Sequence, residues 1–410
     1  MNKLYITLLY LLLSCSLFAQ EQIRIVGYNV KQYPANNNRS SDFNRILKAV
    51  NPTILLTVEL DGTDAVQQLL SNGLDSRYKA STEVNIKWGT GNECAVFYLD
   101  SVVTYLGHSL IAADTRPIGE FKFVNKSSND TFYVFGVHLK AFPEETSRRL
   151  SAVNSLRNRT FRLKPTDNYL VLGDFNIFTS AEPAFQRLLD KSFFGFFIDM
   201  LDLNGSWNNN PLFASAATYS PSSLKTRLDM ILISPTLTDG KGMEYVPNSF
   251  KVFGNDNGKH FGTFINDASR GDNSWFATDP AIGVSLRSAS DHLPVLAEFS
   301  FSKTTSIQKQ YSLPEKFELS QNYPNPFNPE TTIRYQIPKV AAPNAAEVHV
   351  SLKVYDALGR EVATLVNENQ QAGLYNSKLS IHNSQLSSGV YFYQLKVGNF
   401  VKTKKMLVIK

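Results

Sequence analysis

Short apolar runs alternate with stretches of helical periodicity from Ile23 to about Phe301. An apolar run of four to eight residues bounded by turn residues is typical of a buried strand. Seven runs have this form: 23–30 (IRIVGYNV), 53–60 (TILLTVEL), 93–99 (ECAVFYL), 131–139 (TFYVFGVHL), 169–175 (YLVLGDF), 228–234 (LDMILIS) and 294–301 (PVLAEFSF). A helix that stops at Asn51 and Pro52 is predicted from four apolar residues at helical spacing: Phe43, Ile46, Leu47 and Val50.

A second helix is predicted from about Glu144 to Phe161. Its inner face is expected to carry Leu150, Val153 and Leu156. The remaining surface of this helix holds four arginines: Arg148, Arg149, Arg157 and Arg159. We expect these arginines to form a solvated face, and an anion-binding role is the alternative.

The pattern of apolar and polar residues changes near residue 302. Residues 303–316 are polar and are predicted to be a linker, and residues 321–338 (QNYPNPFNPETTIRYQIP) are dense in proline and asparagine. Five short strand-like runs separated by turn residues follow: 347–356, 361–366, 373–381, 390–397 and 401–409. This spacing predicts a small all-β sandwich over residues 317–410. It holds no cluster of acids or histidines, so we expect the chemistry to lie before it.

The totals agree with two folded domains. A chain of 410 residues is long for one ordinary domain, and 43% hydrophobic with 19% charged residues is the composition of a globular protein. The formal net charge of +5 is mild. It permits an anionic substrate without demanding one, because nucleic-acid binders usually concentrate more basic charge on one face.

The first 20 residues, MNKLYITLLYLLLSCSLFAQ, have the form of an export signal. A lysine, an apolar stretch and a small residue at Ala19 predict a signal peptide over residues 1–19. The alternative is a lipoprotein signal in which Cys15 is acylated. Elsewhere no stretch approaches the roughly 20 apolar residues of a spanning helix, so we expect no transmembrane segment in the mature chain. Without Cys15 the one remaining thiol is Cys94, which excludes an intramolecular disulfide.

Polar residues of catalytic type stand at the ends of the seven predicted strands. They are Asn29, Glu59, Glu93, His138, Asp174, Asn176, Asp229, Asp291 and His292. Each alone has an ordinary explanation as a turn former, a satisfied core histidine or a cap, but these explanations do not account for the combination. In the string GDFN, alternation along a strand would put Asp174 and Asn176 on one face and so into one polar site.

These residue types suit phosphoryl chemistry. Mg²⁺ takes oxygen ligands and keeps several waters, so one or two carboxylates suffice, and Glu59 is predicted to be the first. Asp291 can support the metal shell, while the adjacent His292 offers a base whose tautomer Asp229 can fix. Donors to the phosphate oxygens are predicted to be Asn176, Asn29 and His138.

With these residues the chain resembles the superfamily of endonucleases, exonucleases and phosphatases, to which deoxyribonuclease I and exonuclease III belong. The resemblance covers about 23–301 and rests on YN, a glutamate after a strand, HL, GDFN, RLDMIL and SDHLPV. It implies an α+β fold over residues 20–302: a four-layer α/β/β/α sandwich of two packed mixed sheets with helices outside. It also implies cleavage of phosphate esters with a divalent metal.

The resemblance assigns a role to each matching position. The residues that it implies for the metal site are Glu59, Asn29 and Asp291. The residues that it implies for catalysis are His138, Asp174, Asn176, Asp229, His292 and Glu93. Glu93 is the expected partner of His138, as in the deoxyribonuclease I type, and Arg116 occupies the place of a frequent family arginine. Mg²⁺ is the expected ion, with Mn²⁺ or Ca²⁺ as alternatives.

Some segments depart from the family pattern. After Glu59 come Leu60, Asp61 and Gly62, without the basic residues that several nucleases use there against DNA. Ile177 and Phe178 replace the Tyr-Arg pair of inositol-phosphate phosphatases, which argues against that branch. The long polar insertion over 235–289 is expected to overhang the cleft and to affect specificity.

The C-terminal region has its own resemblance. The strings QNYPNPFNPETTIRY, VYDALGREVATLV, LSSGVYFYQLKVG and VKTKKMLVIK are similar to the sorting domain that the type IX secretion machinery recognises. This implies export across an outer membrane, with release from the cell or display on its surface, and it agrees with the predicted signal peptide.

The sequence therefore predicts a secreted, monomeric, metal-dependent phosphodiesterase, foremost a nuclease acting on DNA or RNA. The enzyme alternative is a sphingomyelinase-like lipid phosphodiesterase or a small-molecule phosphatase. A different class is an inactive surface-binding module, which loss of the strand-end acids would favour. The sequence does not separate DNA from RNA, endo from exo cleavage, or one metal from another.

Overall fold

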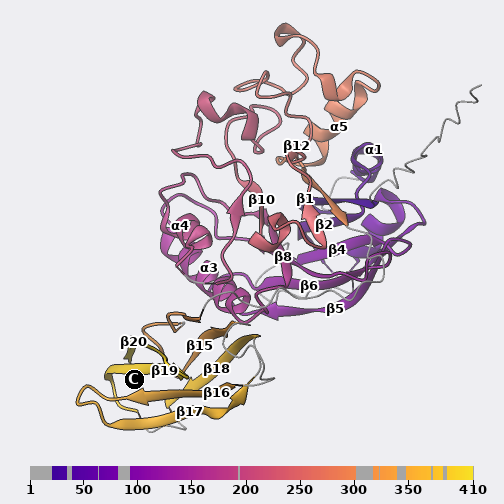
Figure 1. Ribbon diagram of the computed structural model, residues 1–410. Helices are drawn as coiled ribbons and strands as arrows, with labels where there is room; N and C mark the ends of the chain where they lie inside the picture. The colour runs from indigo at the N-terminus through magenta and orange to yellow at the C-terminus, as the bar shows by residue number, and fades with distance from the viewer. Residues whose placement is uncertain are drawn as a thin grey trace, which may run out of the picture.

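The computed structural model describes residues 21–34, 39–62, 64–81, 93–192, 194–301, 317–322, 324–338, 348–370, 373–381 and 386–409 (Figure 1). The predicted signal peptide, with Cys15, and the predicted linker over 303–316 lie outside the described residues. The seven apolar runs of the first domain all form strands, as predicted.

Seven strands of the first domain form one sheet. Their order is β11-β13-β1-β2-β4-β3, with β12 also paired to β13. The strands are β1 (Glu21–Tyr33), β2 (Ile54–Leu60), β3 (Tyr78–Ala80), β4 (Glu93–Leu99), β11 (Met243–Tyr245), β12 (Lys251–Val252) and β13 (Val295–Phe301). β1 and β2 run parallel, so their C-terminal ends lie at the same edge of the sheet.

A second sheet has six strands in the order β5-β6-β7-β8-β10-β9. They are β5 (Val103–Ile111), β6 (Ile118–Asn125), β7 (Thr131–His138), β8 (Asn168–Asp174), β9 (Ile198–Asp199) and β10 (Asp229–Ile233). β7 and β8 are parallel, and β10 is antiparallel to β8. The apolar pattern of the sequence did not reveal β5 and β6, because polar residues interrupt the apolar ones in both strands and most of β5 is at least partly exposed.

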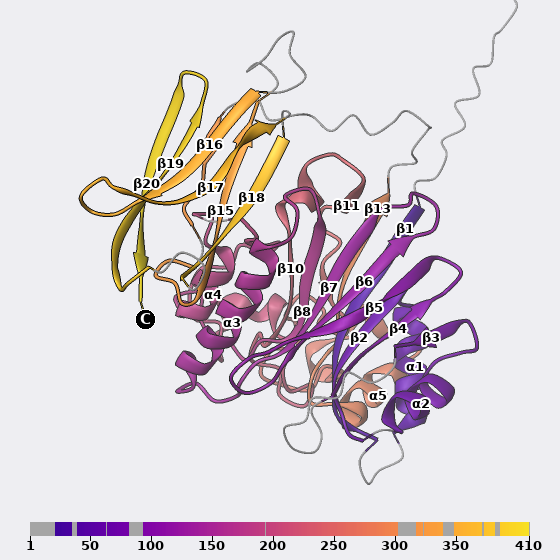
Figure 2. The same ribbon diagram turned by 90° about the horizontal axis from the view of Figure 1, so that it is seen from below.

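The two sheets pack face to face, with β1 and β2 against β7 and β8. Residues of both inner faces, such as Leu56 and Leu172, are fully buried in one apolar cluster. Figure 2 shows α3 (Thr146–Phe161) and α4 (Pro183–Leu189) on one side of the sheets. On the other side lie α1 (Ser40–Val50), α2 (Ala65–Gln68) and α5 (Ala281–Ala289). These layers confirm the predicted α/β/β/α sandwich.

Both predicted helices form. All four apolar residues expected on the inner face of α1 are buried, and the helix ends at Asn51, whose φ of 46° is left-handed and whose N–H bonds to Leu47 O at 2.8 Å. The connections also contain one short π-helix, η1 (Leu69–Gly73). Four short 3-10 helices lie in the other connections: η2 (Pro211–Ala216), η3 (Pro235–Thr238), η4 (Ala268–Arg270) and η5 (Ser274–Phe276).

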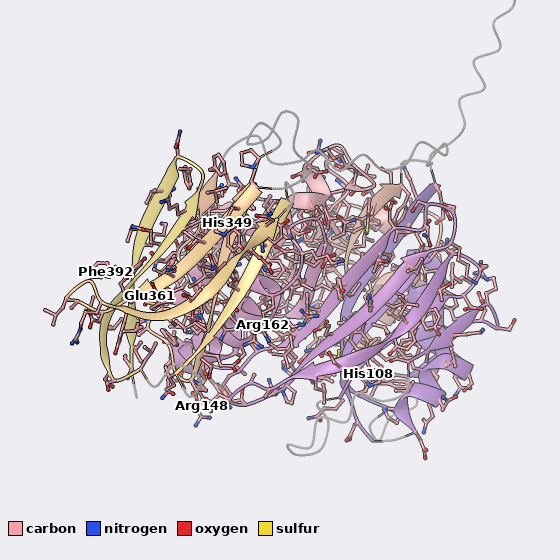
Figure 3. All side chains as sticks on the ribbon, turned by 60° about the horizontal axis from the view of Figure 1, so that its bottom comes forward. His108, Arg148, Arg162, His349, Glu361 and Phe392 are labelled. Atoms are coloured by element: carbon pink, nitrogen blue, oxygen red, sulfur yellow. The ribbon has the colours of Figure 1, made fainter. Side chains whose placement is uncertain are left out.

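The arginine face predicted for α3 is wrong in part. Arg149 and Arg157 are 0% and 1% exposed, while Arg148 lies at the surface (Figure 3). The reason is that α4 and the segment after it cover a second stripe of α3. Arg157 donates to Asp190 O at 3.0 Å there, and Arg159 pairs with Glu120.

The insertion over 235–289 contributes much of its length to the scaffold. Its strands β11 and β12 extend the first sheet along β13, and α5 packs against α1. Residues 262–265 bond to the segment around Leu224 through Gly262 N to Leu224 O (2.7 Å) and Ile265 N to Pro221 O (3.1 Å). The insertion therefore braces the loop that leads into β10.

The C-terminal region forms two small sheets, as predicted. One holds β14 (Glu318–Leu319), β15 (Glu330–Ile337) and β18 (Gly373–Ser380), and the other has the order β17-β16-β19-β20. The latter strands are β16 (Val348–Tyr355), β17 (Glu361–Gln370), β19 (Gly389–Val397) and β20 (Phe400–Val408). A separate apolar cluster fills the space between the sheets, so this region has its own core. Among all described helices, none is long and apolar enough to cross a membrane.

The C-terminal region rests on the end of α3, as Figures 1 and 2 show. Arg334 of β15 is 3% exposed, and its guanidinium lies 4.4 Å from the ring centre of Phe161 and 5.4 Å from that of Phe194. Its Nη2 donates to Leu163 O at 2.6 Å. Burial lowers the pKa of Arg334 to about 10. Arg334 therefore links the C-terminal region to the first domain through two cation–π contacts and one hydrogen bond to a backbone carbonyl just after α3.

Candidate active site

Strand register brings three of the predicted residues into one row. In the second sheet His138 at the end of β7 pairs with Asp174 at the end of β8, and Asp174 pairs with Asp229 at the start of β10. Asn29 and Glu59 reach the same place from β1 and β2 of the first sheet. The site therefore lies where corresponding edges of the two packed sheets meet.

Unusual backbone conformations orient two of these side chains, those of Asp174 and Glu59. Gly173 has a φ of 131°, and a Cβ there would lie 2.1 Å from Val137 O, so only glycine fits before Asp174. Glu59 has a φ of 64° at an irregularity in the register of β2 with β4. A bulge of this kind redirects a side chain at the cost of local strain, which is a common feature of functional sites.

Asn29 bridges two acids from opposite sheets. Its Nδ2 donates to Glu59 Oε1 at 2.9 Å and to Asp174 Oδ2 at 3.2 Å. Its Oδ1 accepts from Lys31 N at 3.0 Å. Asn29 is fully buried, so this bridge holds both carboxylates with little freedom. Asn29 thus holds the two acids in place, and its predicted part in the metal shell stays a prediction.

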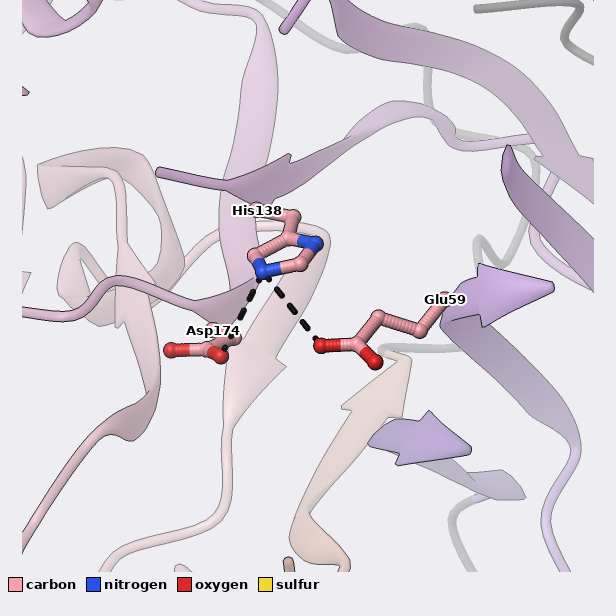
Figure 4. A group of neighbouring side chains, drawn as sticks. All are labelled: Glu59, His138 and Asp174. Carbon is pink, nitrogen blue, oxygen red and sulfur yellow. Dashed lines mark ion pairs between the residues drawn. The ribbon is translucent and has the colours of Figure 1, made fainter. Parts of the chain in front are cut away.

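Glu59, His138 and Asp174 form a group that could hold a metal ion (Figure 4). His138 Nε2 lies 3.5 Å from Glu59 Oε1 and 3.7 Å from Asp174 Oδ2. His138 Nδ1 is buried and has no hydrogen-bond partner among the described residues. Glu93 begins β4, but its side chain lies outside the described part of the structure, so its pairing with His138 stays a prediction.

His292 and Asp229 form a dyad on the other side of Asp174. His292 Nδ1 lies 2.7 Å from Asp229 Oδ2, and His292 Nε2 lies 3.8 Å from Asp174 Oδ2. The backbone N–H of His292 donates to Ser290 Oγ, which donates to Asn29 O at 2.7 Å. A buried carboxylate on Nδ1 leaves Nε2 as the ring atom that faces the site.

Burial and charge shift the pKa of three groups. Burial, reinforced by Asp229 and Glu59 and opposed by His292, raises the pKa of Asp174 to about 7. Burial, with the cations Arg116, His292 and Lys140, holds the pKa of His138 well below its usual value. Burial also acts to lower the pKa of His292, but the neighbouring carboxylates, led by Asp229, outweigh it and raise that pKa to about 10.

The segment after His138 is held by side chains. Arg116 Nη1 donates to Leu139 O at 2.9 Å and to His138 O at 3.4 Å, which gives this arginine a positioning role. Asn176 Nδ2 also donates to Leu139 O, at 3.2 Å. The φ of Asn176 is 50°, and its N–H bonds to Asp174 Oδ1, so a turn rather than strand alternation brings these two residues together.

Asp291 stands at the rim of the site. Its side chain is 35% exposed and pairs with Lys31 at 3.5 Å, outside the group of three that could hold a metal. Tyr219 was not predicted, and its ring lies 5.1 Å from that of His292 at an angle of 63°. It belongs to a loop and not to a strand end, so the pattern of polar residues at strand ends gave no signal for it.

The fold and the site together define a phosphoesterase-type scaffold, and comparison with known families agrees. Residues 26–292 match the model of the endonuclease/exonuclease/phosphatase family, and residues 321–410 match that of the secretion system C-terminal sorting domain. The chain belongs to the endonuclease/exonuclease/phosphatase family, whose members hydrolyse phosphoester bonds. Its C-terminal domain is of the type IX sorting kind, which indicates secretion and surface attachment.

Several solved structures share the fold at low identity. They include the catalytic domain of human Nocturnin with bound sulfate (19% identity, 68% of this chain and 95% of that chain, TM-score 0.45). They also include D. rerio TDP2 complexed with single strand DNA product (15%, 68% and 100%, 0.48) and a mannosyl-6-phosphatase of Bacteroides thetaiotaomicron (16%, 68% and 100%, 0.45). No curated protein matches the chain.

Proposed function

We propose that this protein is a secreted, divalent-metal-dependent phosphodiesterase that hydrolyses extracellular nucleic acid. One observation carries the proposal: the carboxylate of Asp174 lies between a metal-capable group and an acid–imidazole dyad. The first is Glu59 with His138, and the second is His292 with Asp229. His138, His292 and Asp229 are buried and Glu59 is partly exposed, all at one edge of the sandwich, where a phosphate would meet both groups together.

The donor set fits a divalent cation. Glu59 Oε1, Asp174 Oδ2 and His138 Nε2 lie within 4.8 Å of one another, and neither oxygen is within hydrogen-bond distance of the imidazole nitrogen. Carboxylate oxygens suit Mg²⁺, Mn²⁺ or Ca²⁺, and an imidazole widens the range to softer ions. Bound there, a divalent cation would polarise a phosphoryl oxygen and lower the pKa of a coordinated water.

The residues of the chain have separate tasks in this proposal. Asn29 keeps the Glu59 and Asp174 carboxylates in place, and Asp229 holds the His292 ring so that Nε2 faces Asp174. Hydrolysis joins a water oxygen to phosphorus, breaks the bond to the leaving oxygen and moves one proton to that oxygen. His292 Nε2 is the atom placed to give or take that proton.

The substrate class follows from the charges around the site. Two exposed or half-exposed cations are tied to site residues: Lys31 pairs with Asp291, and the charge of Lys140 acts on His138. Arg148, half-exposed in the first turn of α3, is a third cation on the segment that follows His138. A nucleic acid offers several phosphates to such cations, and its affinity should fall steeply with salt. The burial of Arg149 removes it from this surface, so charge reversal at Arg148 alone is the appropriate probe of binding.

A substrate panel tests the proposal. The mature protein is incubated with single-stranded DNA, RNA, sphingomyelin, a sugar phosphate and bis(4-nitrophenyl) phosphate, with Mg²⁺ or with EDTA. We expect hydrolysis of DNA or RNA that EDTA abolishes and added metal restores. Cleavage of the small diester or of sphingomyelin, with no nucleic acid hydrolysed at low salt, would favour the small-molecule or lipid alternative. No metal-dependent cleavage of any substrate would favour an inactive binding module.

A further inference from the structure

Two large aromatic side chains remain exposed on segments that are attached to the site. Phe142 is 59% exposed and Tyr219 is 37% exposed, and both are among the few large hydrophobic residues that the described surface leaves open. Most such side chains in the first domain are covered. Ligand sites are lined largely by hydrophobic and aromatic side chains, so rings that stay exposed on segments attached to the site are candidates for contact with a ligand.

The backbone around Phe142 is fixed by side chains. Buried Arg149 donates to Lys140 O (2.9 Å), Phe142 O (2.6 Å) and Pro143 O (3.1 Å), while its Nε bonds to Glu182 at 2.6 Å. Together with Arg116 and Asn176 on the carbonyls of residues 138 and 139, side chains occupy five of the six carbonyls from His138 to Pro143. This strap, residues 138–143, is therefore rigid before any ligand arrives.

The strap holds Phe142 in an unfavourable backbone conformation. Its φ is 76°, in the left-handed region that is costly for an aromatic residue. Lys140 Nζ lies 5.4 Å from the centre of the Phe142 ring, and its charge is one of those that act on His138. The strap thus presents an aromatic ring and a cation side by side, directly after a residue of the site.

Tyr219 is held as firmly on the other side. Its N–H bonds to Thr226 O at 2.9 Å, and the next N–H, of Ser220, bonds to Asp291 O at 2.7 Å. The braced loop fixes the ring against His292. His138 and His292 approach the same Asp174 oxygen, His138 from the end of β7 and His292 from the side of β10. Phe142 belongs to the strap that begins with His138, and Tyr219 contacts His292, so the two rings belong to segments attached to the two histidines.

We propose that Phe142 and Tyr219 are specificity-determining residues that stack on the nucleobases on the two sides of the scissile phosphate. The inference rests on the proposed function and adds a requirement to it: the enzyme reads planar aromatic groups next to the phosphate, and not the phosphate alone. Stacking of a base on an aromatic side chain is tolerant of sequence, so the preference should extend to every base. A base on either side would then raise kcat/KM.

Defined single-stranded oligonucleotides test this inference. All phosphates but one are methylphosphonates, and an abasic tetrahydrofuran residue replaces the base on the 5′ or the 3′ side of the scissile phosphate. The measured quantity is the ratio of kcat/KM for the normal substrate to that for each abasic substrate. For the wild type we expect each ratio to be roughly 5- to 100-fold, the range that stacking energies give.

The variants separate stacking from support of the fold. Phe142→Ala should bring one ratio close to one and Tyr219→Ala the other, while Phe142→Trp should retain it. Leu358→Ala, which removes an 80% exposed apolar side chain from the C-terminal domain, is the control and should keep both ratios. The ratio is internal to each variant, so a general loss of activity through a disturbed His292 does not move it.

Three results would contradict the account, and they can be told apart. Wild-type enzyme that cleaves normal and abasic substrates equally well overturns the inference alone. Alanine variants that keep the wild-type ratios do the same, because the base preference would then come from other residues. Wild-type enzyme that cleaves no oligonucleotide but does cleave bis(4-nitrophenyl) phosphate overturns the nuclease proposal, and this inference falls with it.

Discussion

At the scale of single residues, the site depends on one amide. Asn29 Nδ2 touches carboxylates from both sheets, so the two acids stay close although each disfavours the charge of the other. A cation between them would relieve that repulsion. The sequence predicted most of the residues that the structure brings together here, because they stand at strand ends. It did not reveal how Asp174 and Asn176 meet, because a left-handed residue breaks the alternation on which that prediction relied.

The dyad supplies the residue-scale prediction. His292→Ala and Asp229→Asn should each lower kcat roughly 100- to 10,000-fold, because one removes the proton-transferring ring and the other its orienting carboxylate. The measurement is metal-dependent hydrolysis of the best substrate of the panel, with circular dichroism to check folding. His349→Ala, at an exposed histidine of the C-terminal domain (Figure 3), should change nothing. A folded His292→Ala variant with full activity would exclude the assigned role.

At the scale of elements, apolar periodicity predicted seven strands and two helices of the first domain, but it did not predict their environments. The prediction for α1 was confirmed residue by residue, because one apolar stripe meets one sheet. In α3 a second stripe is covered by α4 and the strap, and arginine fills it because a long side chain with five donors can satisfy carbonyls that an apolar residue would leave unpaired. Periodicity of apolar residues does not reveal a buried cation.

Adjacent arginines of α3 make a matched pair of variants. Arg149→Ala should lower the free energy of unfolding by about 3–5 kcal/mol, because it leaves buried Glu182 without its partner and frees three carbonyls of the strap. Arg148→Ala, whose side chain is 50% exposed, should lower it by less than about 1 kcal/mol. Urea unfolding of both variants measures the difference. Equal losses would mean that Arg149 does not clamp the strap.

At the scale of the whole molecule, α3 lies between the candidate active site and the C-terminal sorting domain. Its N-terminal end follows the strap, its C-terminal end meets Arg334, and 16 residues span about 24 Å between them. The sequence predicted two domains from their different patterns of apolar and polar residues. It gave no sign of this contact, because Arg334 lies in a segment that is dense in proline and asparagine, and nothing in that pattern indicates a buried arginine.

Truncation after Lys316 should therefore leave the enzyme active. The remaining domain keeps its two sheets and its site, so we expect kcat within about twofold of the full chain, with loss of release or display outside the cell. Rates of the purified forms and localisation of both in the producing cells are the measurements. The cut also uncovers the rings of Phe161 and Phe194, so we expect a lower unfolding temperature. Unchanged display after truncation would refute the sorting role.

The central claim is that Glu59, His138 and Asp174 bind the metal on which phosphodiester hydrolysis depends. The most direct measurement is the hydrolysis rate of metal-stripped enzyme against Mg²⁺ or Mn²⁺ concentration, for the wild type and for Glu59→Gln, with Glu361→Gln (Figure 3) as the control. The account predicts a saturable rise from near zero in the wild type and in the control. For Glu59→Gln it predicts a half-saturating concentration at least tenfold higher. Full activity without metal, or a Glu59→Gln curve that overlays the wild type, would contradict it.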